Sequence, residues 1–582
     1  MSRQRLVRRR LSVALAAVTL VFGVFGLRLF QIQGIDAQAY AAMAIEAGTA
    51  RSVVPAPRGE ILDRNGEVLA TSVAGTTITA DPSMTSAEAP RIAKILVDEL
   101  GEDELDYFAT VDLLRTEGSR YVVVAKDLPA ERAQSAVAAV REEELTGVFS
   151  EKVTLRAYPG NRLAANLVGF VDGERKGVQG LERQYDDILT GSDGEATYEV
   201  SPRGQRIPMA DSTVKEMVPG TDVETTIDRD LQWYSDQRLV DAVRSSGAEW
   251  GLAITIDVRT GQVVQLSQAP TFDPEDPRTI QDSTSVSRYL QTVYEPGSVM
   301  KPIIMAALAD LGKVTPETQI SVPGQMLIDR FRIADYWEHG RINLTAAGVI
   351  AKSSNLGTII AAQQMDDDTM HDYLASFGFG SATGIALPGE SQGILPPAAG
   401  WTRANHATIS FGQGVSVTAV QMLSAIAAIA NGGVLVEPTV VGGFVDGDGN
   451  RTPVPAPATR QVVSKEAASM ATRMMEAVTD DDGTAPAAQI PGYRVAGKTG
   501  TAWRVNPQTG RYVRGQNTVS FVGFAPADAP RFATYVVLDR PHRDAGGGST
   551  AAPVFHDIMS MALERFGVPP TGSARPKVEQ EW

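Results

Sequence analysis

The sequence predicts an α+β fold: a five-stranded antiparallel sheet covered by helices, preceded by an elongated mixed α/β domain and one membrane-spanning helix. Two stretches of alternating apolar and polar residues, 251–270 and 518–541, each predict a hairpin. A single strand is predicted between them, at residues 493–504. Strands and helices do not alternate here, which argues against a parallel sheet. Two predicted helices are able to cover the strands, at residues 299–312 and 551–566.

The N-terminus carries the pattern of a membrane anchor. Five arginines occur within residues 1–10, and no charged residue follows until Arg28. The apolar stretch is longer than that of a cleaved signal peptide and lacks a small-residue cleavage site. We therefore predict an uncleaved helix at residues 11–28, with a signal peptide as the alternative. Because basic flanks stay in the cytoplasm, residues 1–10 are expected inside and the rest of the chain outside, in a single-pass topology.

Composition divides the remainder of the chain. Residues 29–50 indicate a juxtamembrane linker, 51–220 a pedestal domain, 221–566 the largest domain and 567–582 a polar tail. The formal net charge of -16 offers no general phosphate-binding surface, so nucleic acid is not an expected partner. The absence of cysteine excludes a thiol nucleophile, and the five histidines lack metal-ligand spacing. No metal and no cofactor are expected.

Ser298 and Lys301 stand one helical turn apart, where a Pro-Gly turn passes into a predicted helix. Residues i and i+3 share a helix face, so the two side chains are expected to meet. This S-x-x-K pattern alone is a weak signal, because Ser212 and Lys215 repeat it in a polar stretch. The alternative is an N-cap serine beside a solvated lysine. A serine nucleophile with a lysine base would need no histidine.

Two more polar triplets favour a catalytic Ser298–Lys301 pair over the N-cap alternative. Ser353–Asn355 supplies S-x-N, and Lys498–Gly500 supplies K-T-G on the strand predicted at 493–504. The order S-x-x-K, S-x-N, K-T-G resembles the motif set of penicillin-binding proteins and class A β-lactamases. The stretches RGEILDRNG, RAYP, GVQGLE, YEPGSVMKP and SFGQGVSVT resemble class B penicillin-binding proteins. The likeness is closest to the septal cell-division type, although elongation and sporulation relatives share these stretches.

The resemblance implies roles for the site residues. Ser298 would be the nucleophile, and Lys301 its base once burial and a second cation, Lys498, have lowered the lysine pKa. Ser353 would relay a proton to the leaving group. Asn355 would hold the substrate amide.

The K-T-G strand supplies the other contacts that the resemblance implies. The backbone N–H groups of Ser298 and Thr501 would form the oxyanion hole. The triplet Lys498, Thr499 and Gly500, together with Thr501, would bind the terminal carboxylate of the substrate.

The resemblance also implies a fold and a function. The fold is a penicillin-binding transpeptidase domain on a dimerisation-like pedestal. The function is that of a serine D,D-transpeptidase that is anchored in the bacterial cell membrane and cross-links peptidoglycan stem peptides. The resemblance implies that β-lactams inhibit it. It also implies a role in septal growth beside a polytopic glycosyltransferase and other cell-wall synthesis proteins. Three alternatives stay open: an elongation or sporulation transpeptidase, a hydrolytic β-lactamase or carboxypeptidase with Glu390 as base, and a β-lactam-binding scaffold.

Overall fold

The computed structural model describes residues 3–36, 38, 49–199, 212–505, 509 and 511–582. Two compact units alternate along the sequence. The first comprises residues 1–57, 74–154 and 191–219, and the second comprises residues 58–73, 155–190 and 220–582. Two segments of the predicted pedestal, 58–73 and 155–190, therefore group with the larger second unit.

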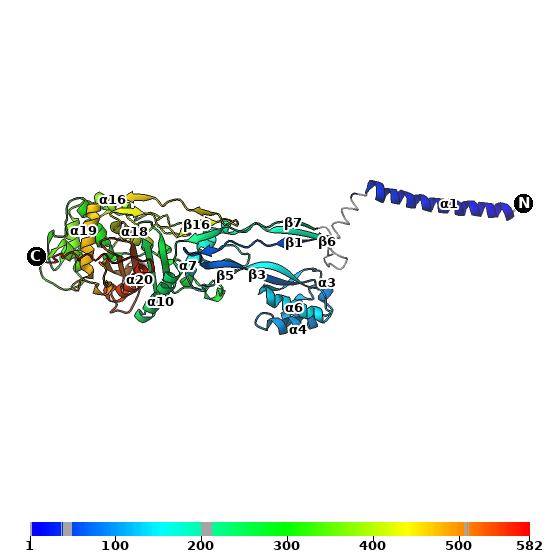
Figure 1. Cartoon of the computed structure of the whole chain (residues 1–582), viewed down its shortest axis with the longest axis horizontal. Coiled ribbons are helices and arrows are strands. Elements are labelled where there is room, and N and C mark those ends of the chain that lie inside the picture. The colour runs from blue at the N-terminus through cyan, green and yellow to red at the C-terminus, as the bar shows by residue number, and fades with distance from the viewer. Residues whose placement is uncertain (1–2, 37, 39–48, 200–211, 506–508, 510) are drawn as a thin grey trace. The chain divides into compact units, whose positions relative to one another are not determined.

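Helix α1 (Arg3–Phe30) is long and apolar enough to cross a membrane (Figure 1). At about 1.5 Å per residue its 28 residues extend about 42 Å, which exceeds a hydrocarbon core of about 30 Å. The candidate span, Val7–Ile35, includes the predicted anchor at 11–28. Most of the predicted juxtamembrane linker, at residues 37 and 39–48, lies outside the described residues.

The first unit contains a three-stranded antiparallel sheet in the order β1-β6-β7. The second S-x-x-K pattern, Ser212–Lys215, is strand β7 and not a helix start. Three amphipathic helices of this unit pack with β3 and β4 around a hydrophobic core of their own. The elements that lie wholly or partly in this unit are β1 (Thr49–Val54), β3 (Val68–Ala80), α4 (Ala89–Leu100), α5 (Tyr107–Leu113), β4 (Val122–Pro129), α6 (Ala130–Glu142), β5 (Val148–Ala157), β6 (Gly194–Glu199) and β7 (Ser212–Lys215).

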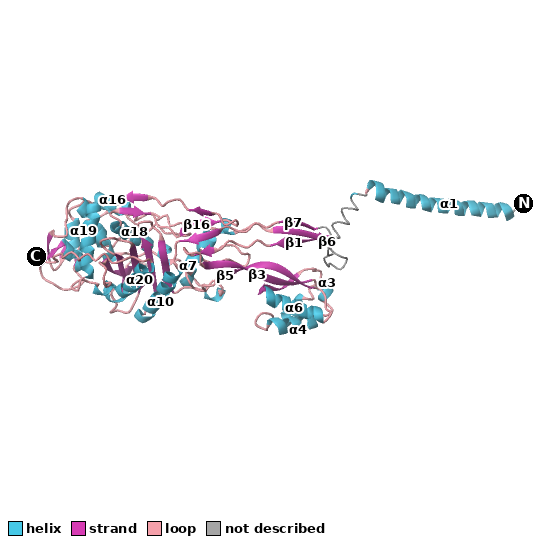
Figure 2. Cartoon of the chain, in the orientation of Figure 1, coloured by secondary structure: helices cyan, strands magenta, loops and turns pink. Residues whose placement is uncertain are grey.

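The second unit is built on a five-stranded sheet in the order β10-β9-β21-β20-β19. Every neighbouring pair is antiparallel, which confirms the predicted sheet. Helix α10 packs against β10 and helix α20 against β21, and Figure 2 shows both helices among the strands of this unit. The strands are β9 (Trp250–Asp257), β10 (Val263–Ala269), β19 (Ala496–Val505), β20 (Tyr512–Ala525) and β21 (Phe532–Asp539).

Two helices of the second unit are apolar all round and lie in its core. Nearly every residue of α13 and every residue of α18 is buried, as expected for helices without a polar face. The helix predicted at 299–312 is α13, preceded by a 3₁₀ turn. The α-helices of six or more residues in this unit are α10 (Arg229–Ser246), α13 (Lys301–Asp310), α14 (Ala346–Ala351), α15 (Asn355–Ala362), α16 (Asp367–Ser376), α17 (Arg403–Ser410), α18 (Ala419–Ala430), α19 (Lys465–Glu476) and α20 (Ala552–Arg565).

The second unit also contains short strands that pair outside the five-stranded sheet. They include the antiparallel pair β11 and β14, which lies beside the site described below. Their bounds are β2 (Ile61–Leu62), β8 (Asp222–Thr225), β11 (Gln319–Val322), β12 (Met326–Ile328), β13 (Phe331–Ile333), β14 (Ile342–Thr345), β15 (Val434–Val436), β16 (Val441–Val445), β17 (Arg451–Pro453) and β18 (Thr459–Gln461).

A buried ion-pair network joins three separate stretches of the second unit. The Glu182 carboxylate, wholly buried, lies 2.7 Å from Arg58 Nε and 2.6 Å from Arg156 Nε. Arg156 also donates to Gly59 O at 2.8 Å, and Arg58 donates to Thr190 Oγ1 at 2.7 Å. Arg58 and Gly59 belong to the RGEILDRNG stretch, Arg156 to RAYP and Glu182 to GVQGLE. The paired charges therefore favour this packing of the segments, because separating them would leave a buried charge without its partner.

Candidate active site

Ser298 stands at the start of the central buried helix. Gly297 turns the chain with a left-handed φ of +59°, and a Cβ there would lie 3.0 Å from Thr501 O. Ser298 follows in the 3₁₀ turn Gly297–Met300, and Lys301 begins α13. The glycine thus allows the serine to approach strand β19, and the S-x-x-K pair occupies a helix start as predicted.

Lys301 is buried and hydrogen-bonded to the S-x-N residues. Its side chain is 0% exposed, so the alternative of a solvated lysine is wrong. Lys301 Nζ donates to Ser353 O at 2.6 Å and to Asn355 Oδ1 at 2.8 Å, and it lies 3.3 Å from Ser353 Oγ. Within the described residues it makes no hydrogen bond to Ser298. Catalytic hydrogen bonds often tighten only when the substrate binds.

The S-x-N residues form a tight turn between α14 and α15. Ser353 adopts a left-handed φ of +59°, which is unusual for a residue with a side chain. Ser354 is the N-cap of α15, and its Oγ accepts from Gly357 N at 2.9 Å. The turn thus presents Ser353 and Asn355 to the lysine.

Lys498 reaches the same serine from the sheet. Its Nζ donates to Ser353 Oγ at 2.9 Å, to Thr499 O at 3.0 Å and to Thr499 Oγ1 at 3.1 Å. Lys498, like Lys301, is 0% exposed. The three motifs therefore meet at one hydroxyl group, that of Ser353.

The two lysines have lowered pKa values. Burial lowers the pKa of Lys301 to about 7, although the Asp335 carboxylate opposes the change. Burial and, to a smaller extent, the charge of Lys301 lower the pKa of Lys498 well below its ordinary value. Each amine disfavours the charged form of the other, because two cations around one buried hydroxyl repel each other. A neutral amine is the form that accepts a proton from a serine nucleophile.

Sequence reasoning missed the buried carboxylate that holds the S-x-N turn. Asp335 Oδ1 accepts from the backbone N–H groups of Asn355 at 2.5 Å and Leu356 at 3.0 Å. Asp335 Oδ2 accepts from Ser354 Oγ at 2.7 Å, and His339 Nε2 lies 3.0 Å from the same oxygen. A lone aspartate in a connecting loop carries no local signal, so only the three-dimensional structure reveals this contact.

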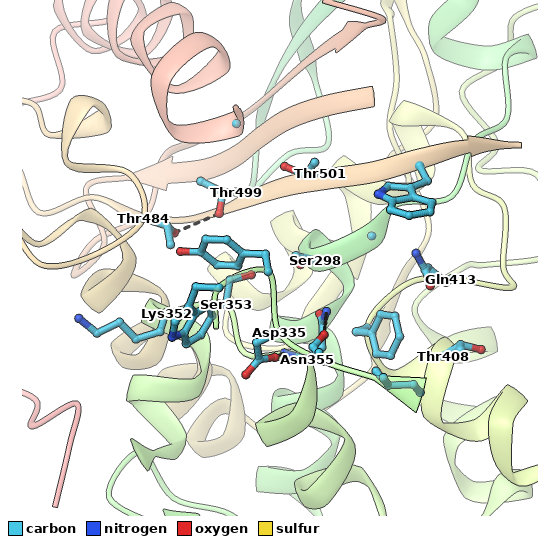
Figure 3. Close-up of a pocket in the computed structure, with 18 of the residues that line it drawn as sticks. Ser298, Asp335, Lys352, Ser353, Asn355, Thr408, Gln413, Thr484, Thr499 and Thr501 are labelled. Atoms are coloured by element: carbon cyan, nitrogen blue, oxygen red, sulfur yellow. Dashed lines mark hydrogen bonds between the residues drawn. The ribbon is translucent and has the colours of Figure 1, made fainter. Parts of the chain in front are cut away.

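The three motifs border one pocket of about 1550 Å³. Figure 3 shows Ser298 between the strand that carries Thr499 and Thr501 and the elements that carry Ser353 and Asn355. These five residues line the pocket. The wholly buried Lys301 and Lys498 are not among the lining residues.

Strand β19 forms the far edge of the sheet, paired only with β20 in the part of the chain that the structure describes. Thr499 Oγ1 meets Thr484 Oγ1 at 3.0 Å. Gly500 does not line the pocket. A Cβ there would lie 2.2 Å from Ser520 Oγ, so glycine allows the close packing behind the strand. The outer edge of the strand offers backbone groups to an extended peptide.

Glu390, the alternative base, has a structural contact. Its Oε1 accepts from Thr383 N at 2.7 Å and from Thr383 Oγ1 at 2.5 Å. The residue does not line the pocket. Its carboxylate therefore stabilises a turn at a distance from Ser298.

Comparison with known proteins adds to this geometry. Residues 251–560 match the family described as penicillin binding protein transpeptidase domain, and residues 53–225 match the penicillin-binding protein dimerisation domain. Penicillin-binding protein PbpB of Mycobacterium tuberculosis is 35% identical over 580 residues, which cover 95% of this chain and 84% of that protein. Peptidoglycan D,D-transpeptidase FtsI of Escherichia coli is 31% identical over 541 residues, covering 91% of this chain and 87% of that one. The crystal structure of penicillin binding protein 3 from Mycobacterium tuberculosis complexed with aztreonam has a TM-score of 0.71 and 31% identity, and covers 91% of this chain and 100% of that chain.

Proposed function

Because the chain belongs to the penicillin-binding protein family with a transpeptidase domain, we propose that it cross-links peptidoglycan stem peptides through an acyl-enzyme on Ser298. Its family makes it a serine-type peptidoglycan D,D-transpeptidase, so the proposal concerns which residues act. One observation carries the assignment. Ser353 Oγ lies 3.3 Å from Lys301 Nζ and 2.9 Å from Lys498 Nζ, and Ser353 and Ser298 line the same pocket.

Acylation begins with proton transfer. Neutral Lys301 takes the hydroxyl proton of Ser298, and the serine Oγ attacks the carbonyl carbon of the penultimate D-Ala. The backbone N–H groups of Ser298 and Thr501 stabilise the oxyanion that forms. The peptide C–N bond then breaks, and the leaving D-Ala amine takes the proton, relayed from Lys301 through Ser353.

The donor peptide lies extended along the outer edge of β19. Thr499 and Thr501 bind its terminal carboxylate with the help of Lys498, for which an anion is a favourable partner in a buried site. Asn355 holds an amide of the peptide. A β-lactam occupies the same place, and opening of its ring leaves the drug esterified to Ser298.

The second half-reaction uses an amine. The amine of an acceptor stem peptide attacks the acyl carbon, forms the new C–N bond and gives up a proton to Lys301. The Ser298 ester bond breaks, and Oγ takes a proton back. Attack by water in place of the amine would give only hydrolysis.

The membrane helix supports a location at the cell membrane. The arginines within residues 1–10 favour a cytoplasmic N-terminus and an extracytoplasmic catalytic unit. A transpeptidase does not polymerise glycan, so we propose a polytopic glycosyltransferase as its partner. Confinement of both proteins to one membrane raises their effective concentration. The resemblance to the septal type favours a role in division, with elongation and sporulation as the alternatives.

Purified full-length protein in detergent tests the proposal. It is incubated with a synthetic stem peptide ending in D-Ala-D-Ala and a peptide amine acceptor, and the products are analysed by mass spectrometry. We expect the cross-linked amide with the wild type and with the control Ser212→Ala, and no product with Ser298→Ala. Hydrolysed donor as the only product at saturating acceptor would contradict the transpeptidase assignment.

A further inference from the structure

The polar tail predicted at residues 567–582 follows a defined path along the second unit. Arg575 forms an ion pair with Asp480 and donates to Thr479 Oγ1 at 2.6 Å. Val578 packs against the main hydrophobic core. The composition of the tail did not predict these contacts.

The tail segment, defined here as residues 578–582, pairs with strand β14. The contacts are Thr345 N to Gln580 O at 3.0 Å, Trp582 N to Asn343 O at 3.3 Å, and an antiparallel bridge between Leu344 and Glu581. Strand β14 also pairs with β11 on its other side. The tail segment thus extends the small antiparallel sheet formed by β11 and β14.

This pairing lies at the start of helix α14. Thr345 is the N-cap of that helix, and its Oγ1 accepts from Gly348 N at 3.0 Å and donates to Glu579 O at 2.6 Å. A Cβ on Gly348 would lie 1.8 Å from Gln580 O. Glycine is a poor helix former, so the close approach of the tail segment explains its presence within α14.

Helix α14 carries the S-x-N turn. It has only six residues, and its last turn passes directly into that turn. Ser353 N donates to Ile350 O at 3.2 Å, and Ser354 N donates to Val349 O at 2.9 Å. A displacement at the start of so short a helix therefore moves the Ser353 hydroxyl relative to the two lysines.

We propose that the tail segment is a positioning element of the active site, which holds α14 and thereby the Ser353–Asn355 turn. Glu581 and its bridge partner Leu344 line the same pocket as Ser298, so the segment also forms part of the pocket wall. The rate of acylation then depends on residues that belong to none of the three motifs. This inference rests on the proposed role of Ser298 as the acylated residue.

Gly348→Ala in the full-length protein forces α14 and the tail segment apart without removing the segment, because the added Cβ would lie 1.8 Å from Gln580 O. The matched control is Gly400→Ala, because a Cβ at Gly400 meets nothing within 4 Å. Stopped-flow measurements with a fluorescent penicillin, below the unfolding transition, separate the dissociation constant of the initial complex from the acylation rate constant. For Gly348→Ala we expect the rate constant to fall about tenfold to a hundredfold with an unchanged dissociation constant, as misplacement of a catalytic group predicts. Gly400→Ala should match the wild type.

Equal acylation rate constants in Gly348→Ala and the wild type would overturn the inference, even with a lower melting temperature, because the tail segment would then only stabilise the fold. A second variant that lacks residues 578–582 should be slowed similarly. A synthetic peptide of residues 576–582, but not its scrambled form, should restore the rate. A truncated protein that acylates normally, or whose loss the peptide does not restore, also overturns the inference. A wild type without an adduct on Ser298 would instead contradict the proposed function.

Discussion

Burial of Lys301 predicts how acylation depends on pH. The pKa of this lysine is lowered from 10.5 to about 7, so the amine is neutral above pH 7 and charged below it. Only the neutral amine takes the Ser298 proton, and the acylation rate should therefore rise with pH and level off. With a pKa of about 7, the neutral fraction is about 0.9 at pH 8 and about 0.03 at pH 5.5, which predicts an approximately 30-fold fall in rate. A lysine with an ordinary pKa would give a rate still rising at pH 10.

The assay is the stopped-flow acylation rate constant with a fluorescent penicillin, measured from pH 5.5 to 9.5. Lys313→Ala is a suitable control, because Lys313 is exposed and does not line the pocket. Its profile should match that of the wild type. A rate that does not change across this range, or one that still rises at pH 9.5 without levelling off, would refute the reasoning that a buried neutral Lys301 is the base.

Three further substitutions test other parts of the site and fold. Lys301→Arg keeps a cation that does not become neutral, so acylation should fall at least about a hundredfold while the penicillin still docks; near-normal acylation would mean that another group takes the proton. Asp335→Asn weakens the acceptor of the S-x-N turn and should lower the free energy of unfolding by about 1–3 kcal/mol and the acylation rate about tenfold, measured by urea unfolding and stopped flow; an unchanged rate would show that the turn keeps its shape without the carboxylate. Glu182→Gln removes the anion shared by Arg58 and Arg156, although Arg58 keeps a second carboxylate, Asp186, at 2.8 Å, and it should cost about 3–5 kcal/mol of stability at an unchanged acylation rate per folded molecule. An unchanged urea midpoint would contradict the view that the network stabilises the second unit.

The sheet of the second unit was predictable because its signals are local. Residues 251–270 and 518–541 each contain two short apolar runs and a turn, and they became β9–β10 and β20–β21. Helix α18 was likewise predictable as a core helix, since its apolar stretch is too short for a membrane span. The strand predicted at 493–504 became β19, which carries Lys498, Thr499 and Thr501.

The state of Lys301 was not predictable from local patterning. A serine and a lysine one turn apart fit both an exposed N-cap and a buried base, and only the packing of α13 against the S-x-N turn decides between them. The left-handed conformation of Ser353 also depends on that packing. The motif order indicated the function, whereas the burial of Lys301 lowers its pKa and so allows it to act as a base.

Contacts between distant parts of the chain were missed for a related reason. Glu182 meets an arginine 124 positions away, and Thr345 meets Glu579 across 234 positions. Neither pairing produces a periodicity or a composition bias. The sequence consequently predicted only that the tail is polar, and the predicted pedestal did not show that its segments 58–73 and 155–190 group with the second unit.

Intact-protein mass spectrometry after incubation with penicillin tests the central claim, that Ser298 is the acylated nucleophile, most directly. We expect a single adduct with the mass of the drug on the full-length wild type, mapped by peptide analysis to Ser298 and absent from Ser298→Ala. An adduct that persists in Ser298→Ala, or that maps to Ser212, would contradict the account.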